Sequence, residues 1–155
     1  MKIINRLFPI IASFIFLSCG ELEDSDIPST YVNLTLDLTY EDKELNTVTA
    51  HKIYTTKDIN TSQQEAVGFG GIIVYHSTLN GYVAYDIACP YELNANTVVT
   101  AEEFSLTATC PKCGSVYDLE NGGRPLSGPS AENPGRKRLR IYSTTKVGNK
   151  IYVSN

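Results

Sequence analysis

An alternation of apolar and polar residues with a period of two constrains the fold of this chain more than any other feature. From position 32 the sequence reads VNLTLDLTY, in which Val, Leu, Leu, Leu and Tyr occupy every second place. This pattern is typical of a β-strand with one buried face. Two further β-rich runs, at 68–75 and 82–85, flank Asn80-Gly81, a dipeptide that favours a two-residue hairpin turn. The sequence therefore predicts an all-β fold that contains this hairpin.

The rest of the chain supports the same class of fold. Further strands are expected at 48–54, 103–109, 115–119, 139–143 and 150–153, separated by Gly, Asn and Pro turn residues. One or two helical turns are expected only near 62–66. With 155 residues in total, the chain has room for one ordinary domain, which we assign to residues 30–155.

The N-terminus has the character of a targeting segment. Lys2 and Arg6 precede an apolar run at 7–17, which is far shorter than the roughly 20 residues that a membrane-spanning helix needs. The run ends in Leu-Ser-Cys-Gly at 17–20, which resembles the lipobox of bacterial lipoproteins. That resemblance implies a signal peptide at 1–18, lipid on Cys19, and a lipid-anchored protein of the bacterial envelope. An ordinary cleaved signal and a buried helix are the alternatives.

Charge separates the regions behind the anchor. After cleavage the chain has 11 Lys and Arg against 17 Asp and Glu, a net charge of −6, which excludes binding to nucleic acid through a basic surface. Acids gather in an expected tether at 19–29, a pattern that resembles the export signal of some surface lipoproteins. We therefore expect the outer membrane as the location, with display at the cell surface. The basic run RKRLR at 136–140 is expected to be a solvated strand edge.

Three cysteines lie in two short loops. The first loop is Cys-Pro-Tyr-Glu at 89–92, and the second is Cys-Pro-Lys-Cys-Gly-Ser-Val-Tyr-Asp at 110–118. Two such loops at neighbouring sheet ends are able to bring several metal ligands to one point, although Cys89, Cys110 and Cys113 supply only three thiolates. The two histidines, His51 and His76, lie outside both loops.

From about 67 to 153 the chain resembles the Rieske domain, whose iron–sulfur centre is held by C-x-H and C-x-x-H loops. The resemblance implies a Rieske-like antiparallel β-sandwich with a small two-loop cluster-binding subdomain. By position, Cys89 and Cys110 match the two cysteine ligands, while Tyr91 and Cys113 stand in place of the two histidines. The resemblance further implies hydrogen bonds from Ser115 and Tyr117 to the sulfurs, and a covering proline loop at Gly128-Pro129.

Three interpretations of this site remain open. In the first, Cys89, Cys110, Cys113 and Tyr91 hold an atypical [2Fe–2S] cluster for electron transfer, with a potential nearer about −400 mV than the Rieske range. In the second, an oxidising envelope produces a disulfide, either Cys89–Cys110 or Cys110–Cys113. In the third, zinc binds the three thiolates, with water, Tyr91 or Glu92 as the fourth ligand.

The last two interpretations make the protein a redox-silent structural or binding module that keeps the Rieske scaffold. No motif for independent catalysis is visible, so we do not expect an enzyme. The expected partners are the membrane, through the lipid anchor, and a redox or protein partner that the sequence leaves unidentified.

Overall fold

The structure is a computed structural model, and it describes residues 22–132 and 136–155. The signal peptide predicted at 1–18, the predicted lipid attachment site at Cys19 and the first residues of the tether lie outside these ranges. Within them, no helix has the length and apolar character that crossing a membrane requires.

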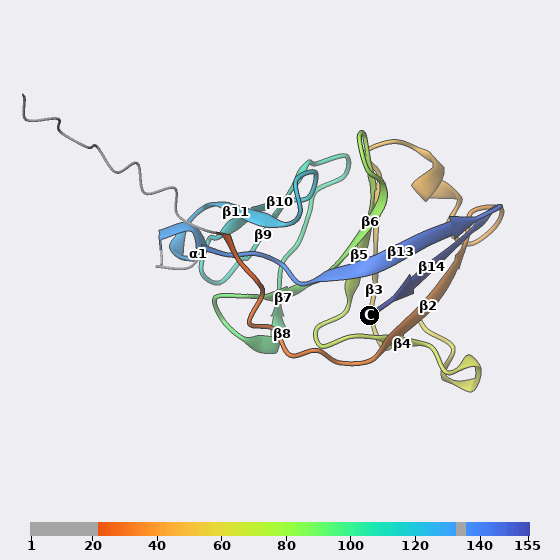
Figure 1. The fold of residues 1–155 in the computed structure, drawn as a ribbon, viewed down its shortest axis with the longest axis horizontal. Helices are drawn as coiled ribbons and strands as arrows, with labels where there is room; N and C mark the ends of the chain where they lie inside the picture. The colour runs from red at the N-terminus through yellow and green to blue at the C-terminus, as the bar shows by residue number, and fades with distance from the viewer. Residues whose placement is uncertain (1–21, 133–135) are drawn as a thin grey trace, which may run out of the picture.

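A seven-stranded sheet forms the larger part of the domain (Figure 1). Its order is β3-β5-β6-β13-β14-β2-β4, and all neighbouring strands in it are antiparallel. The strands are β2 (Val32–Asp37), β3 (His51–Tyr54), β4 (Ala66–Val67), β5 (Ile72–Ser77), β6 (Gly81–Asp86), β13 (Ile141–Val147) and β14 (Lys150–Ser154).

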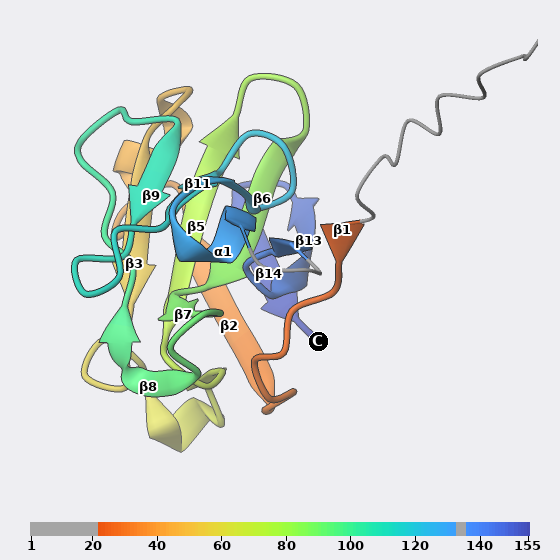
Figure 2. The same ribbon diagram turned by 90° about the vertical axis from the view of Figure 1, so that its left-hand side faces the viewer.

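A smaller subdomain lies against one face of this sheet (Figure 2). It contains a three-stranded sheet in the order β11-β10-β9 and a hairpin of β7 and β8. The strands are β7 (Ala88–Cys89), β8 (Asn94–Val98), β9 (Thr107–Thr109), β10 (Val116–Asp118) and β11 (Arg124–Ser127), followed by the one-turn helix α1 (Pro129–Glu132). At its side, β1 (Leu22–Glu23) pairs in parallel with β12 (Arg136–Lys137).

Strand β5 separates two hydrophobic cores. Because successive side chains of a strand point to opposite faces, Ile72 and Val74 enter the core of the large sheet, while Ile73 and Tyr75 enter the core beneath the subdomain. All four are fully buried. This two-sided burial explains why the sequence of β5 is continuously apolar rather than alternating.

The structure confirms the all-β prediction and the hairpin across Asn80-Gly81, which joins β5 and β6. Each of the other predicted strands is present, several of them shorter than expected. The predicted helical turn near 62–66 is a 3-10 turn at Thr61–Gln63, and a second one lies at Lys43–Asn46. The sequence did not predict β8, β11 or α1, which are short or polar elements whose ends are determined by tertiary contacts.

The acidic segment and the basic run contact each other. Asp24 forms an ion pair with Arg138, and Asp26 forms one with Lys137 at 3.1 Å. Between them and β2, Ile27 is fully buried and its carbonyl accepts a 2.7 Å hydrogen bond from Arg140 Nε. The basic run is therefore partly covered by the chain's own acids, rather than fully solvated as expected from the sequence.

Candidate metal centre

The two cysteine loops have the same local construction. In each, proline follows the cysteine, which presets φ for a tight turn. The carbonyl of Cys89 accepts from the backbone N–H groups of Glu92 and Leu93, at 3.2 and 3.0 Å. The carbonyl of Cys110 likewise accepts from Gly114 N at 2.9 Å, and Gly114 has a φ of +74° that favours glycine. Each loop thus closes on its own cysteine and presents it at the end of a strand.

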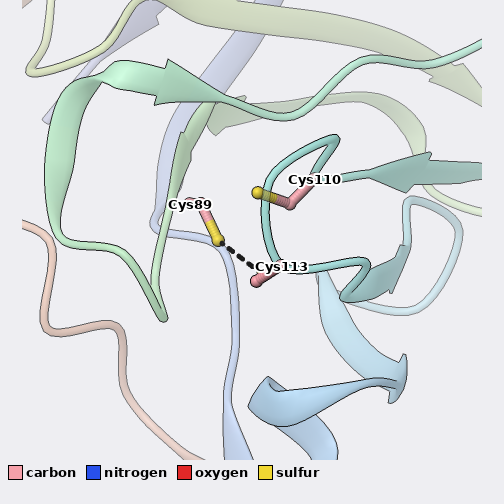
Figure 3. A group of neighbouring side chains, drawn as sticks. All are labelled: Cys89, Cys110 and Cys113. Atoms are coloured by element: carbon pink, nitrogen blue, oxygen red, sulfur yellow. Dashed lines mark hydrogen bonds between the residues drawn. The ribbon is translucent and has the colours of Figure 1, made fainter.

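The loops bring three sulfur atoms to one point (Figure 3). The Sγ atoms of Cys89, Cys110 and Cys113 all lie within 4.8 Å of one another, and those of Cys89 and Cys113 are 3.7 Å apart. Cys89 and Cys110 are completely buried, whereas Cys113 is partly exposed. All three are free cysteines. Cys89 and Cys113 thus form a close pair that was not among the disulfide pairs expected from the sequence.

Two chains of hydrogen bonds run from these sulfurs to α1. The hydroxyl of Tyr117 lies 3.4 Å from Cys89 Sγ and 2.6 Å from Ser130 Oγ. Cys113 Sγ donates to Ser115 Oγ at 3.2 Å, and Ser115 Oγ also accepts from Ser130 N at 3.1 Å. The expected contacts of Ser115 and Tyr117 with the sulfurs are therefore present in the structure.

Ser130 joins both chains, and the sequence prediction missed it. Its only signal was its place directly after Gly128-Pro129, since proline is favoured at the first position of a helix and the next residue begins the helical turn. Gly128 lies so close to the second loop that a Cβ there would be 2.7 Å from Ser115 Cα. The Gly128-Pro129 segment thus packs closely against the second cysteine loop.

Asp86 anchors the first loop and was also missed. It ends β6, and its carboxylate is completely buried. Oδ1 accepts from Ala88 N at 2.8 Å and Gly70 N at 3.1 Å, and Oδ2 accepts from Phe69 N at 2.8 Å and the Tyr142 hydroxyl at 2.7 Å. Because Ala88 immediately precedes Cys89, this carboxylate ties the start of the loop to the large sheet.

An ion pair between Glu92 and Lys112 connects the two loops to each other. Glu92 lies in the turn after Cys89, and Lys112 lies between Cys110 and Cys113. The Lys112 side chain is 65% exposed, so the energetic contribution of this pair is small.

The environment shifts the pKa values of Cys89 and Cys113 in opposite directions. Burial raises the pKa of Cys89 to about 12, so that its thiol keeps its proton at neutral pH unless a cation is near. At Cys113, burial also disfavours the thiolate, but hydrogen bonds with Ser115 and with the other two thiols outweigh it and lower the pKa. A metal ion that binds all three sulfurs must therefore displace protons, most of all from Cys89.

The other predicted candidates lie around the cluster or away from it. Tyr91 is in the first loop and is 46% exposed. His76 lies on β5, where its ring stacks on that of Tyr82 with 4.4 Å between centroids, and His51 lies on β3. Among the described residues, the three cysteines are the one group of His, Cys, Asp or Glu side chains that converges as a metal site.

These residues do not fit a Rieske centre with two histidine ligands, because neither loop presents an imidazole and the converging group among the described residues consists of three thiols. They do fit one tetrahedral ion. A metal–sulfur bond of about 2.3 Å places two sulfurs of a tetrahedron roughly 3.8 Å apart. The observed 3.7 Å between Cys89 and Cys113 agrees with that spacing.

Comparison with known proteins places the fold. No protein-family profile matches the chain, and no curated protein matches it. Among solved structures, the chain is similar to the quaternary ammonium Rieske monooxygenase CntA in complex with an inhibitor, with a TM-score of 0.54 and 8% identity over 80% of this chain. The match spans 31% of that protein's length.

A protein described as the small subunit of an NADPH nitrite reductase is similar over 79% of this chain and 97% of its own, with a TM-score of 0.42 and 11% identity. At these identities a structural likeness concerns architecture alone. The order of the strands, the small subdomain and the likeness to the monooxygenase agree that this chain has a Rieske-like all-β fold.

Proposed function

We propose that this protein is a lipid-anchored envelope protein whose Rieske-like domain binds a single thiophilic metal ion through Cys89, Cys110 and Cys113. Zinc is the ion that we propose. The observation that carries the proposal is the convergence of the three sulfurs, with 3.7 Å between Cys89 and Cys113. Three thiolates are a chemically sound ligand set for zinc, which proteins also bind outside the cytoplasm.

The fourth ligand comes from the exposed side of the site. Cys113 is the partly exposed sulfur, so the open position of the tetrahedron faces solvent there. The carboxylate of Glu92 is engaged by Lys112, which leaves water or the half-exposed Tyr91 as the fourth ligand. A site with an open position binds an additional small ligand more readily than a closed structural site does.

Electron transfer through an iron–sulfur centre with an altered ligand set is the second candidate. The specific observation in its favour is that Tyr117 and Ser115 hydrogen-bond to the sulfurs of Cys89 and Cys113. Hydrogen bonds to ligand sulfurs are one of the means by which proteins tune the potential of a cluster. Against it, three sulfurs so close together suit one ion better than two irons, whose ligands lie farther apart.

Metal analysis of the mature chain decides between the candidates. We expect the protein, produced with both iron and zinc in the medium and purified in detergent, to be colourless and to hold zinc in a stoichiometric amount. Iron together with visible charge-transfer bands would overturn the zinc proposal in favour of the second candidate. A purified protein without either metal would refute both.

A pair of variants tests the assignment of the ligands. Cys113→Ser removes one sulfur at nearly constant size and should abolish stoichiometric zinc. Thr109→Ala is the matched control, because it changes an exposed side chain beside Cys110 and leaves all three sulfurs in place. Equal zinc contents in the two variants would show that Cys113 is not a ligand.

A further inference from the structure

The three sulfurs differ in their access to solvent. Cys89 and Cys110 are completely buried, and Cys113 is the one that is partly exposed. A reagent that arrives from solution therefore reaches Cys113 first. In the oxidising envelope that the N-terminus predicts, the reagents that such a thiol meets include organic disulfides.

The geometry also offers a close second sulfur on the other loop. Cys89 Sγ lies 3.7 Å from Cys113 Sγ, on the opposite loop (Figure 3). A disulfide bond is about 2.05 Å long, so the two atoms need to approach by roughly 1.7 Å to form one. Cys110 belongs to the same turn as Cys113, and its backbone is held there by Cys110 N to Ser115 O and Gly114 N to Cys110 O, both 2.9 Å.

We infer that Cys89 and Cys113 form a redox pair that small organic disulfides oxidise, and that this oxidation releases the metal ion. The inference rests on the proposed function, because the ion and the disulfide compete for the same sulfurs. After oxidation Cys110 is the single remaining thiolate, and one thiolate does not retain zinc in the presence of water.

The reaction proceeds in two exchanges. The sulfur of Cys113 attacks one sulfur of the small disulfide, breaks the S–S bond, and forms a mixed disulfide while one thiolate leaves. The sulfur of Cys89 then attacks the sulfur of Cys113, which forms the Cys89–Cys113 bond and expels the second thiolate. Two electrons pass from the cysteine pair to the reagent, the zinc ion departs as a dication, and the two released thiolates take protons from solvent.

The test uses the zinc-loaded mature chain in detergent, with oxidised glutathione as the probe. Zinc release is followed with a chromogenic chelator, and free thiols are then alkylated. Trypsin cleaves after Lys112, and a glutamate-specific protease cleaves at Glu92, Glu102 and Glu103, so the three cysteines fall into three separate peptides. Mass spectrometry identifies which two remain linked.

We expect loss of the zinc together with a Cys89–Cys113 linkage and an alkylated Cys110, and recovery of zinc binding after reduction. The variant Cys110→Ser should form the same linkage, whereas Cys89→Ser should stop at a glutathione adduct on Cys113. A linkage that includes Cys110, or three alkylated thiols with zinc retained, would overturn the inference.

The two proposals fail in different ways. If the purified chain holds no metal, the proposed zinc site is refuted. Treating the reduced, metal-free chain with oxidised glutathione and mapping the linked peptides then still decides which cysteines form the pair. If zinc is present but the linkage joins other cysteines, the zinc site stands and the redox pair is refuted.

Discussion

Replacement of Asp86 by asparagine should weaken the domain and its metal site together. The carboxylate accepts from three backbone N–H groups and from one tyrosine hydroxyl in a fully buried position. An amide at this place keeps one acceptor oxygen and puts an NH₂ group where the other oxygen was. At least one buried backbone N–H, that of Ala88 or Phe69, then faces another donor.

The magnitude follows from these contacts. A buried donor that loses its acceptor costs about 1–3 kcal/mol, and hydrogen bonds to a charged group contribute about 1.5–3 kcal/mol each. We therefore expect Asp86→Asn to lower the free energy of unfolding by roughly 2–4 kcal/mol, which leaves a domain of ordinary stability folded. At about 4 °C per kcal/mol for a domain of this size, Tm should fall by roughly 8–16 °C.

Thermal and urea unfolding, followed by circular dichroism, measure this change. Glu41→Gln is the matched control, since it removes the same charge from an exposed side chain. Zinc affinity should fall in Asp86→Asn alone, because Ala88 N is the group that holds the start of the first cysteine loop. A Tm for Asp86→Asn within 2 °C of the control, roughly 0.5 kcal/mol, would refute the anchoring role of this carboxylate.

Three further predictions concern the Gly128-Pro129 segment, the hairpin tip and the hydroxyl next to the site. Gly128→Ala should lower the free energy of unfolding in urea by about 1–3 kcal/mol more than Gly148→Ala does. Both glycines have positive φ, but a Cβ at Gly128 would lie 2.7 Å from Ser115 Cα, while one at Gly148 would face open space. Equal decreases in the two variants would mean that the Gly128-Pro129 segment shifts to accommodate the Cβ without a free-energy penalty. Glu120 lies after β10 and is buried against the tip of the β5–β6 hairpin. Burial disfavours its charge, but hydrogen bonds from Thr78, Ser77 and Leu79 hold its pKa below the ordinary 4.5. Because the folded state binds the proton of Glu120 more weakly than the unfolded state does, this stabilisation is present above pH 4.5 and is lost as the pH falls through the folded-state pKa. The midpoint of urea unfolding should therefore decline over that pH range, and the decline should be smaller in Glu120→Gln. Tyr117→Phe should lower the free energy of unfolding by about 1 kcal/mol. It should also alter the thiolate charge-transfer absorption of the cobalt-substituted protein, because the Tyr117 hydroxyl lies 3.4 Å from Cys89 Sγ. An unchanged cobalt spectrum would mean that the hydroxyl does not influence the site.

The sequence was most informative where local pattern and tertiary environment agree. The hairpin across Asn80-Gly81 and the alternating strand β2 are encoded by period-two burial and by turn chemistry, and both were predicted. The polar strand β8 carries no such pattern: its sequence NANTV has one apolar side chain of any size, Val98, which packs partly buried against the core beneath the subdomain. Its existence depends on the position of the first cysteine loop.

The site was predicted as a set of cysteines but not as a geometry. Spacing and the Rieske resemblance pointed to Cys89, Cys110 and Cys113, but not to the 3.7 Å separation of Cys89 and Cys113 across the two loops. The supports of the site were harder to find. Asp86 and Ser130 are an acid and a serine in unremarkable sequence surroundings. Apart from Ala88, the partners of Asp86 are 16 to 56 positions away, and those of Ser130 are 13 to 15 positions away.

Burial alone does not explain why the three cysteines converge. A buried cysteine packs much as a small apolar residue does, so the core beneath the subdomain would be filled equally well by alanine or valine. The hydroxyl of Tyr117 has a hydrogen-bond partner in Ser130 at 2.6 Å, so its own burial is satisfied without any sulfur. Packing and polar satisfaction are thus complete without thiols at this point.

What the thiols add is chemistry. Three sulfurs from two separate loops lie within 4.8 Å of one another, and two of them have hydrogen-bond partners, Tyr117 and Ser115, that are joined through α1. Such support preserves a fixed spacing between ligands, which a passive core does not need and a metal or a redox pair does. The scaffold thus supports three converging sulfurs in a fixed arrangement, and this arrangement is the basis for proposing that the site binds one ion and that a disulfide competes with it.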